Sequence, residues 1–194
     1  MVSHGVRGLK RKEKIVPPRP LYLIVTEGET EKNYFLMIKK RKTSNIAIKC
    51  LKAKHPDTIY IIKSANELLC NCADRSLSQC WIVLDTDVLR AVDITELKRW
   101  QASNSGKRVG ITNPIFEYWM LLHFESPEKE IKKEHCKSKL SKHIPGYQTP
   151  FSNCQLLWPR IDYAISNAQA RAITLEDIHK PNGTNLHILV KKLI

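Results

Sequence analysis

The stretch that decides the fold is LYLIVTEGETEKNYF, residues 21–35. Leu21–Thr26 is an apolar run with the length of a buried strand, and residues 29–41 carry apolar side chains at the spacing of a helix that faces a core. Glu27 stands at the turn between the two. Thr26 and Glu29 have the spacing of a capping box, which predicts that Thr26 caps the helix. The stretch predicts the opening unit of an α/β fold.

The same alternation of strand and helix continues to residue 112. Strands are predicted over residues 46–51, 80–84 and 107–112, and helices over 56–72 and 93–104. Strands separated by helices of this length indicate a parallel sheet flanked by helices. After residue 112 the pattern predicts only helices, over 115–124, 130–142, 155–171 and 184–194, with Asn113 as the cap of the first.

These patterns predict one domain, residues 21–194, behind a basic flexible arm, residues 1–20. The domain would contain a core of four parallel strands, residues 21–112, and a mainly helical C-terminal extension, residues 113–194. No apolar run approaches the roughly 20 residues that cross a bilayer, and the N-terminus has no signal-peptide pattern, so we expect no membrane association and a cytoplasmic location. Six cysteines without the spacing of a zinc module predict reduced thiols.

Acidic residues follow two of the predicted strands. Glu27 comes directly after the first, and the apolar run CWIVLDTDV, residues 80–88, ends in Asp85 and Asp87. Because ligands of parallel sheets gather at the carboxyl ends of the strands, we expect these side chains to meet there, with Glu31 one helical turn after Glu27. Gly28 permits the sharp turn beside them.

Four converging carboxylates repel one another unless a cation neutralises them. Hard oxygen ligands suit Mg²⁺ or Mn²⁺, which can activate water and stabilise the leaving oxygen of a phosphodiester. The sequence therefore predicts that Glu27, Glu31, Asp85 and Asp87 hold such an ion. The alternative is that the two glutamates only cap a helix while the two aspartates begin a loop.

The charge of the chain indicates a polyanionic partner. Lys and Arg number 32 against 19 Asp and Glu, which gives a formal net charge of +13. Such a chain attracts nucleic acid, although a generic solubilising surface is the alternative. Basic residues are clustered, and we expect phosphate contacts from the basic arm and from a cluster over residues 39–54. This cluster contains Lys39, Lys40, Arg41, Lys42, Lys49, Lys52 and Lys54.

Three further segments contain candidate site residues. Glu117 is the one acid within the apolar residues 115–124, so it needs a metal, a base or a hydrogen-bond donor if it is buried. His123 lies six residues on, and an isolated histidine on an apolar helix is more often structural. His187 lies one turn after Thr184, the predicted cap of the last helix, and is expected near the scissile phosphate.

The motifs resemble known families. The Glu27 turn and the Asp85-x-Asp87 motif resemble the Toprim domain of topoisomerases, primases and OLD-type nucleases. The longer strings IVTEGETEKNYF (24–35), TNPIFEYWMLLHFE (112–125) and PNGTNLH (181–187) resemble the RloB family, prokaryotic Toprim-like proteins associated with phage defence. The aspartate motif is also similar to the opening motif of haloacid-dehalogenase-type phosphatases, but there it usually follows the first strand of the core.

The RloB resemblance implies a metal-dependent nuclease that acts in phage defence, often beside an ATPase partner. It implies that Glu27 is the general acid or base, that Asp85 and Asp87 hold the metal, and that Glu31 is an additional or water-mediated ligand. Glu117 is a second catalytic candidate because of its place in the apolar segment. Gly28, Asn113, His123 and His187 would support the site. DNA and RNA, including tRNA, remain open as substrates, as do the oligomeric state and the rival interpretations as a non-catalytic basic adaptor or a phosphatase.

Overall fold

The computed structural model describes residues 19–72, 78–127 and 130–194. The basic arm predicted over residues 1–20 lies outside the described residues, apart from its last two. Of the helices in the described ranges, none combines the length and the apolar composition that crossing a bilayer requires.

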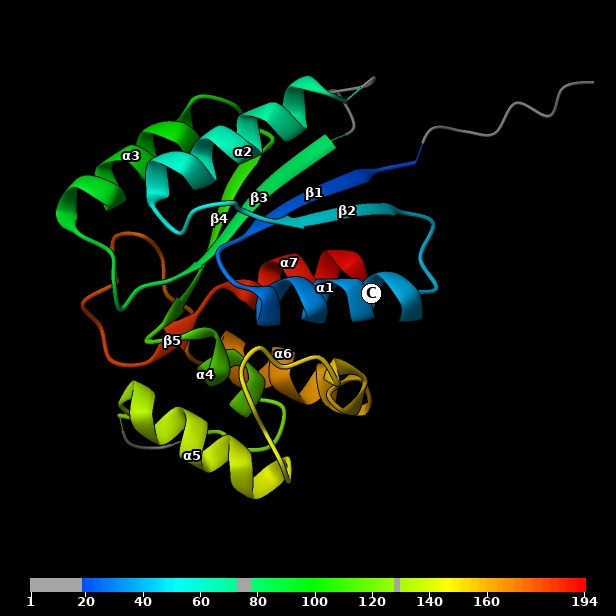
Figure 1. The fold of residues 1–194 in the computed structure, drawn as a ribbon, viewed down its shortest axis with the longest axis vertical. Coiled ribbons are helices and arrows are strands. Elements are labelled where there is room, and N and C mark those ends of the chain that lie inside the picture. The colour runs from blue at the N-terminus through cyan, green and yellow to red at the C-terminus, as the bar shows by residue number, and fades with distance from the viewer. Residues whose placement is uncertain (1–18, 73–77, 128–129) are drawn as a thin grey trace, which may run out of the picture.

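A five-stranded sheet forms the centre of the protein, in the order β2-β1-β3-β4-β5 (Figure 1). Its strands are β1 (Leu21–Thr26), β2 (Ala47–Lys52), β3 (Ser78–Asp85), β4 (Lys107–Asn113) and β5 (Gly183–Thr184). The first four run parallel, as predicted, and β5 runs antiparallel to β4. The predicted count of four strands is wrong, because β5 has only two residues and no apolar run to signal it.

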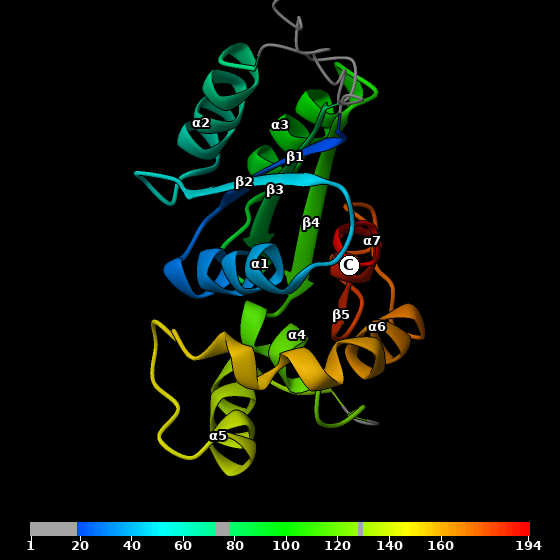
Figure 2. The same ribbon diagram turned by 90° about the vertical axis from the view of Figure 1, so that its right-hand side faces the viewer.

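Helices cover both faces of the sheet. On one face lie α2 (Thr58–Cys70) and α3 (Ala91–Ala102), and on the other lie α1 (Glu29–Arg41) and α7 (Leu186–Leu193) (Figures 1 and 2). A further group lies below α1 and α7 in Figure 1 and contains α4 (Phe116–Leu121), α5 (Lys133–His143), α6 (Ile161–Gln169) and two 3-10 turns, Cys154–Leu156 and Trp158–Arg160. The helical extension therefore lies on the α1 side of the sheet, with α7 against the strands and α4, α5 and α6 beyond it (Figure 1).

The two faces of the sheet bury separate apolar clusters. Alternate residues of β1 divide between them: Leu23 and Val25 pack with α2 and α3, whereas Ile24 packs with α1. The cluster on the α1 side continues into the C-terminal extension, because it contains both Trp81 of β3 and Trp119 of α4. Because the extension shares this core, its helices are held in a fixed position relative to the strand ends.

Two predicted helix caps are wrong. The Thr26 hydroxyl donates a hydrogen bond of 2.9 Å to the carbonyl of Gly28, and α1 begins after Gly28 without a side-chain cap. Asn113 is the last residue of β4, and its side-chain amide donates to the carbonyls of Ile178 and Lys180 at 3.1 and 2.8 Å. Both side chains thus bond loop carbonyls and do not cap a helix.

Candidate active site at the strand ends

The parallel register brings the ends of β1 and β3 together. Thr26 is paired with Val83, so Glu27 and Asp85 both lie just beyond this pair. The backbone amide of Glu27 donates to the carbonyl of Val83 at 3.1 Å, and the amide of Asp85 donates to a carboxylate oxygen of Glu27 at 3.4 Å. These bonds fix Glu27 beside Asp85, although 58 residues separate them in the chain.

A cavity of about 580 Å³ opens at these strand ends. It extends between the loops after β1, β2 and β3 and the helices α4 and α5. Its acidic lining residues are Glu27, Glu31, Asp85, Asp87, Glu117 and Glu134, and its basic ones are Lys52, Lys54, Lys133 and Lys137. The four predicted metal ligands and Glu117 therefore line one cavity, which we call the carboxylate pocket.

Glu31 is the most enclosed acid of the α1 turn. It is 6% exposed, and burial raises the pKa of its carboxyl to about 7, with the charges of Glu27 and Glu117 adding to the rise. The side chain lies tightly against Gly28, where a Cβ atom would meet a carboxylate oxygen of Glu31 at 2.4 Å. Gly28 is needed at this position because any side chain there would displace Glu31.

The ionised form of Asp85 is disfavoured both by burial and by the charges of its neighbours. Burial raises its pKa well above the usual range, and four neighbouring carboxylates raise it further. Its Oδ1 atom is buried without a hydrogen-bond partner. Burial also raises the pKa of Glu27, while the bond from the Asp85 amide opposes this rise. The protein therefore holds more negative charge here than its own donors neutralise.

The outer carboxylates have basic or phenolic partners. Asp87 forms an ion pair with Lys133 at 3.2 Å, and its side chain is 18% exposed. Glu117 is 6% exposed and accepts a hydrogen bond of 2.9 Å from the Tyr147 hydroxyl. The ammonium of Lys137 stands 3.8 Å from the same carboxylate. Glu117 thus faces the pocket with a defined orientation.

The donor chemistry of the pocket fits a hard divalent cation. Carboxylate oxygens are the ligands that Mg²⁺ and Mn²⁺ prefer, and the unpartnered Oδ1 atom of Asp85 lies among them. Within the described residues, however, no group of three or more acidic, histidine or cysteine side chains is arranged to hold a metal ion. Glu27, Glu31, Asp85 and Asp87 would hold the ion only after their side chains moved toward one another.

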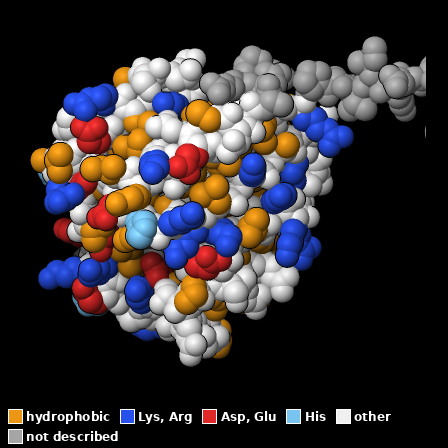
Figure 3. Space-filling model, turned by 45° about the horizontal axis from the view of Figure 1, so that its top comes forward, with side chains coloured by type: hydrophobic (Ala, Val, Ile, Leu, Met, Phe, Trp, Pro, Cys, Tyr) orange, Lys and Arg blue, Asp and Glu red, His pale blue; other side chains and the backbone are white. Residues whose placement is uncertain are grey.

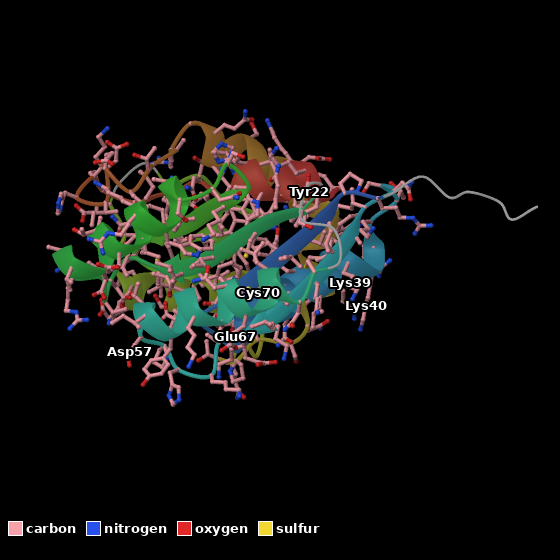
Figure 4. All side chains as sticks on the ribbon, turned by 90° about the horizontal axis from the view of Figure 1, so that it is seen from above. Tyr22, Lys39, Lys40, Asp57, Glu67 and Cys70 are labelled. Atoms are coloured by element: carbon pink, nitrogen blue, oxygen red, sulfur yellow. The ribbon has the colours of Figure 1, made fainter. Side chains whose placement is uncertain are left out.

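Only part of the basic cluster over residues 39–54 lies at the pocket, which Lys52 and Lys54 line. Lys39, Lys40 and Arg41 are exposed at the far end of α1 and follow the pocket residue Glu31 by 8 to 10 residues, which is about 12–15 Å along the helix axis. Figure 4 shows Lys39 and Lys40 toward one end of the molecule and Asp57 toward the other. Lys42 donates hydrogen bonds to the carbonyls of Ser44 and Ile46. Phosphate binding by these four residues stays a prediction.

Elsewhere the positive charge is widely distributed. On the face seen in Figure 3, Lys and Arg side chains are spread over the surface with acidic side chains among them. The lysines beside the carboxylates come from two other segments, the end of β2 and helix α5. A backbone held between these lysines would lie directly over the acidic residues.

The remaining candidates lie away from the carboxylate pocket. His123 is fully buried, and its Nδ1 donates to the carbonyl of Trp119 while its Nε2 accepts from the Tyr34 hydroxyl, both at 3.1 Å. Burial lowers the pKa of His123 to about 4, so the ring is neutral. His187 lies on α7 with a buried, unpartnered Nδ1, and burial lowers its pKa. Neither histidine, nor Asn113, lines the pocket.

Sequence reasoning missed Lys133, Lys137 and Tyr147. The two lysines are four residues apart, which places them on one face of a helix, and this spacing was an available signal. Tyr147 offered none, because it reaches Glu117 from a loop that packs against α1. There the backbone amide of Phe151 donates to the Thr30 hydroxyl at 3.0 Å.

Comparison with known proteins agrees with the motifs. The family model described as RloB-like protein matches residues 22–193, nearly the whole chain. No curated protein and no solved structure gives a match. The match includes both strand ends, the α4 segment that carries Glu117, and the β5 and α7 segments. The chain belongs to the RloB-like family.

Proposed function

We propose that the protein is a metal-dependent nuclease that cleaves phosphodiester bonds in nucleic acid. The observation that carries the proposal is the carboxylate pocket, which is lined by six acids, four of them buried or half-buried, and by four lysines. Such a site attracts a cation to its centre and a polyanion to its rim. Toprim-like metal chemistry on this α/β sheet is part of the proposal.

The side chains divide into three roles. Glu27, Glu31, Asp85 and Asp87 would hold Mg²⁺ or Mn²⁺, which would supply activation of water and stabilisation of the leaving oxygen. Glu117 accepts or donates a proton near the scissile bond, since the Tyr147 hydroxyl and Lys137 hold it toward the pocket. Lys52, Lys54 and Lys133 hold the phosphates on both sides, a contact that positions the backbone without reading sequence.

The biological setting is proposed from the family resemblance alone. In this setting the protein would act as a phage-defence effector, and an ATPase partner would control the nuclease site.

The test compares the protein with its Asp85→Asn variant on labelled DNA and RNA. We expect cleavage with Mg²⁺ or Mn²⁺ and a loss of about 100-fold or more in the variant, because even outer-shell partners of a metal contribute 10- to 100-fold. Asp162→Asn, an exposed acid of α6 outside the pocket, is the matched control. Equal cleavage by wild type and the Asp85→Asn variant would refute the proposal.

A second candidate is a non-catalytic adaptor that binds nucleic acid or a nucleotide. It is favoured by the lack, among the residues that the structure describes, of a group already arranged around a metal. Under this alternative the wild type binds nucleic acid equally well with and without Mg²⁺ and cleaves nothing. Hydrolysis of small phosphomonoesters in place of nucleic acid would instead indicate a phosphatase.

A further inference from the structure

A second cavity adjoins the carboxylate pocket on the side of α2 and α3. Its volume is about 370 Å³, within the range of small-molecule sites. Three residues, Glu27, Pro56 and Val88, line both cavities. The two cavities therefore share a wall. A ligand that occupies one cavity can place a neighbouring part of its structure in the other.

Apolar and polar residues line the second cavity in equal number. Ile61 of α2 and Leu84 of β3 are 1% exposed, and Leu89 packs against the same core. Of the polar residues, Asp57 is exposed and forms no cap hydrogen bond with α2. Asp93 is 6% exposed and holds Arg90 through bonds of 2.8 and 3.1 Å, while the side chain of Arg90 stays 72% exposed. Apolar walls with polar groups beside them match the chemistry of a nucleobase.

We propose that this cavity receives one unpaired base of the nucleic acid whose phosphodiester lies in the carboxylate pocket. The inference rests on the proposed function and names its substrate class. A base inside a duplex is stacked on both faces, so only a single-stranded or extruded nucleotide can enter between apolar walls. The carboxylate of Asp57 accepts hydrogen bonds, so the cavity favours bases that present an amino group.

The charges on the two sides of the shared wall suit different parts of a nucleotide. The lysines at the carboxylate pocket suit the backbone. The second cavity is lined by three carboxylates, Glu27, Asp57 and Asp93, and by Arg90, which is paired with Asp93, so its acceptors suit an uncharged base that presents amino groups. Guanidinium planes stack on bases, and aliphatic walls exclude water from their faces. The carboxylate pocket therefore suits the sugar-phosphate backbone, and the adjoining cavity suits the attached base.

The exposed valines of this region provide a matched pair for the test. Val88 is 61% exposed and lines both cavities, whereas Val92 is 56% exposed and lines neither. Because both side chains are largely in solvent, replacing either with tryptophan leaves the core unchanged. Val88→Trp fills the space beside the shared wall, and Val92→Trp adds the same ring to the surface.

Binding is measured with Ca²⁺ in place of Mg²⁺, on single-stranded and duplex oligonucleotides of one sequence that carry 2-aminopurine at successive positions. We expect tighter binding of the single strand and a rise in fluorescence at one position. Val88→Trp should weaken binding about 5- to 100-fold, the contribution of one stacked base, and remove the fluorescence rise. Val92→Trp should leave both unchanged. Asp57→Asn should reduce the preference for amino-bearing bases.

Equal binding of duplex and single strand by the wild type, or unaltered binding by Val88→Trp, would overturn the base cavity. Cleavage does not enter these measurements, so the two proposals fail separately. A wild type that binds as expected but never cleaves with Mg²⁺ or Mn²⁺ refutes the nuclease and leaves the base cavity supported. A wild type that cleaves nucleic acid but binds duplex and single strand equally refutes the base cavity alone.

Discussion

The buried carboxyl of Glu31 makes the stability of the metal-free protein depend on pH. Its folded-state pKa of about 7 lies above the ordinary value of 4.5, so the unfolded chain ionises more readily than the folded protein. Below pH 4.5 the group is neutral in both states and costs nothing. As pH rises from 4.5 to about 7, Glu31 progressively destabilises the fold.

The size of the effect follows from this interval. At about 1.4 kcal/mol per pH unit, the range from 4.5 to about 7 corresponds to about 3 kcal/mol. Glu31→Gln removes the titration and keeps the shape of the side chain. The free energy of unfolding of the variant, minus that of the wild type, should therefore increase by about 3 kcal/mol between pH 4.5 and 7.5. Any effect of the glutamine amide on stability that does not depend on pH cancels, because only the change of the difference with pH is compared.

The assay is urea denaturation at several pH values in EDTA, followed by circular dichroism. Glu29→Gln is the control, since Glu29 lies in the same helical turn, pairs with Lys32 at 2.8 Å and has a side chain that is 38% exposed. We expect the control to change by well under 1 kcal/mol over the same range. A stability difference for Glu31→Gln that stays constant from pH 4.5 to 7.5 would refute the electrostatic account of the pocket.

Three further predictions concern contacts around the site. Gly28→Ala should lower the affinity for Mg²⁺, measured by calorimetry, with a small loss of stability, because the new methyl group displaces the flexible end of Glu31. Tyr147→Phe should cost about 1 kcal/mol in urea denaturation and leave the circular dichroism spectrum intact, since it removes one hydrogen bond to Glu117. Gly110→Ala should cost about 1–3 kcal/mol, because its Cβ would lie 2.8 Å from a side chain of α7; an unchanged melting curve would contradict the packing of α7 on β4.

The sequence predicted what depends on local pattern and on parallel topology. Apolar runs identified four strands, and the rule that parallel strands end at one edge brought Glu27 to Asp85 across 58 residues. The strand β5 and the contact of Tyr147 with Glu117 could not be predicted, because neither has a local pattern and both depend on how the extension packs. The caps predicted at Thr26 and Asn113 were wrong, because the sequence does not show which loop carbonyls compete for a side chain. The hydroxyl of Thr184, the third predicted cap, accepts a hydrogen bond of 3.1 Å from the amide of Leu186 at the start of α7.

The basic cluster shows a different limit of sequence reasoning. Lys39 follows Glu31 closely in the chain, yet a helix carries its residues apart by about 1.5 Å each, so the two lie at opposite ends of α1. Proximity in sequence is therefore a poor guide to a shared site once a helix intervenes. The lysines beside the carboxylates come from segments far from them in the chain.

Under the proposed function, the basic residues at the far end of α1 would set a length scale for the substrate. Lys39 and Arg41 follow Glu31 by 8 and 10 residues, which is about 12 and 15 Å along the helix axis, and the phosphates of a stacked strand are spaced about 3.4 Å apart. A stacked strand of about five nucleotides would be the shortest that reaches from the carboxylate pocket to these residues. Shorter fragments would contact one end only and dissociate more readily, so the products of cleavage would leave while longer chains are retained.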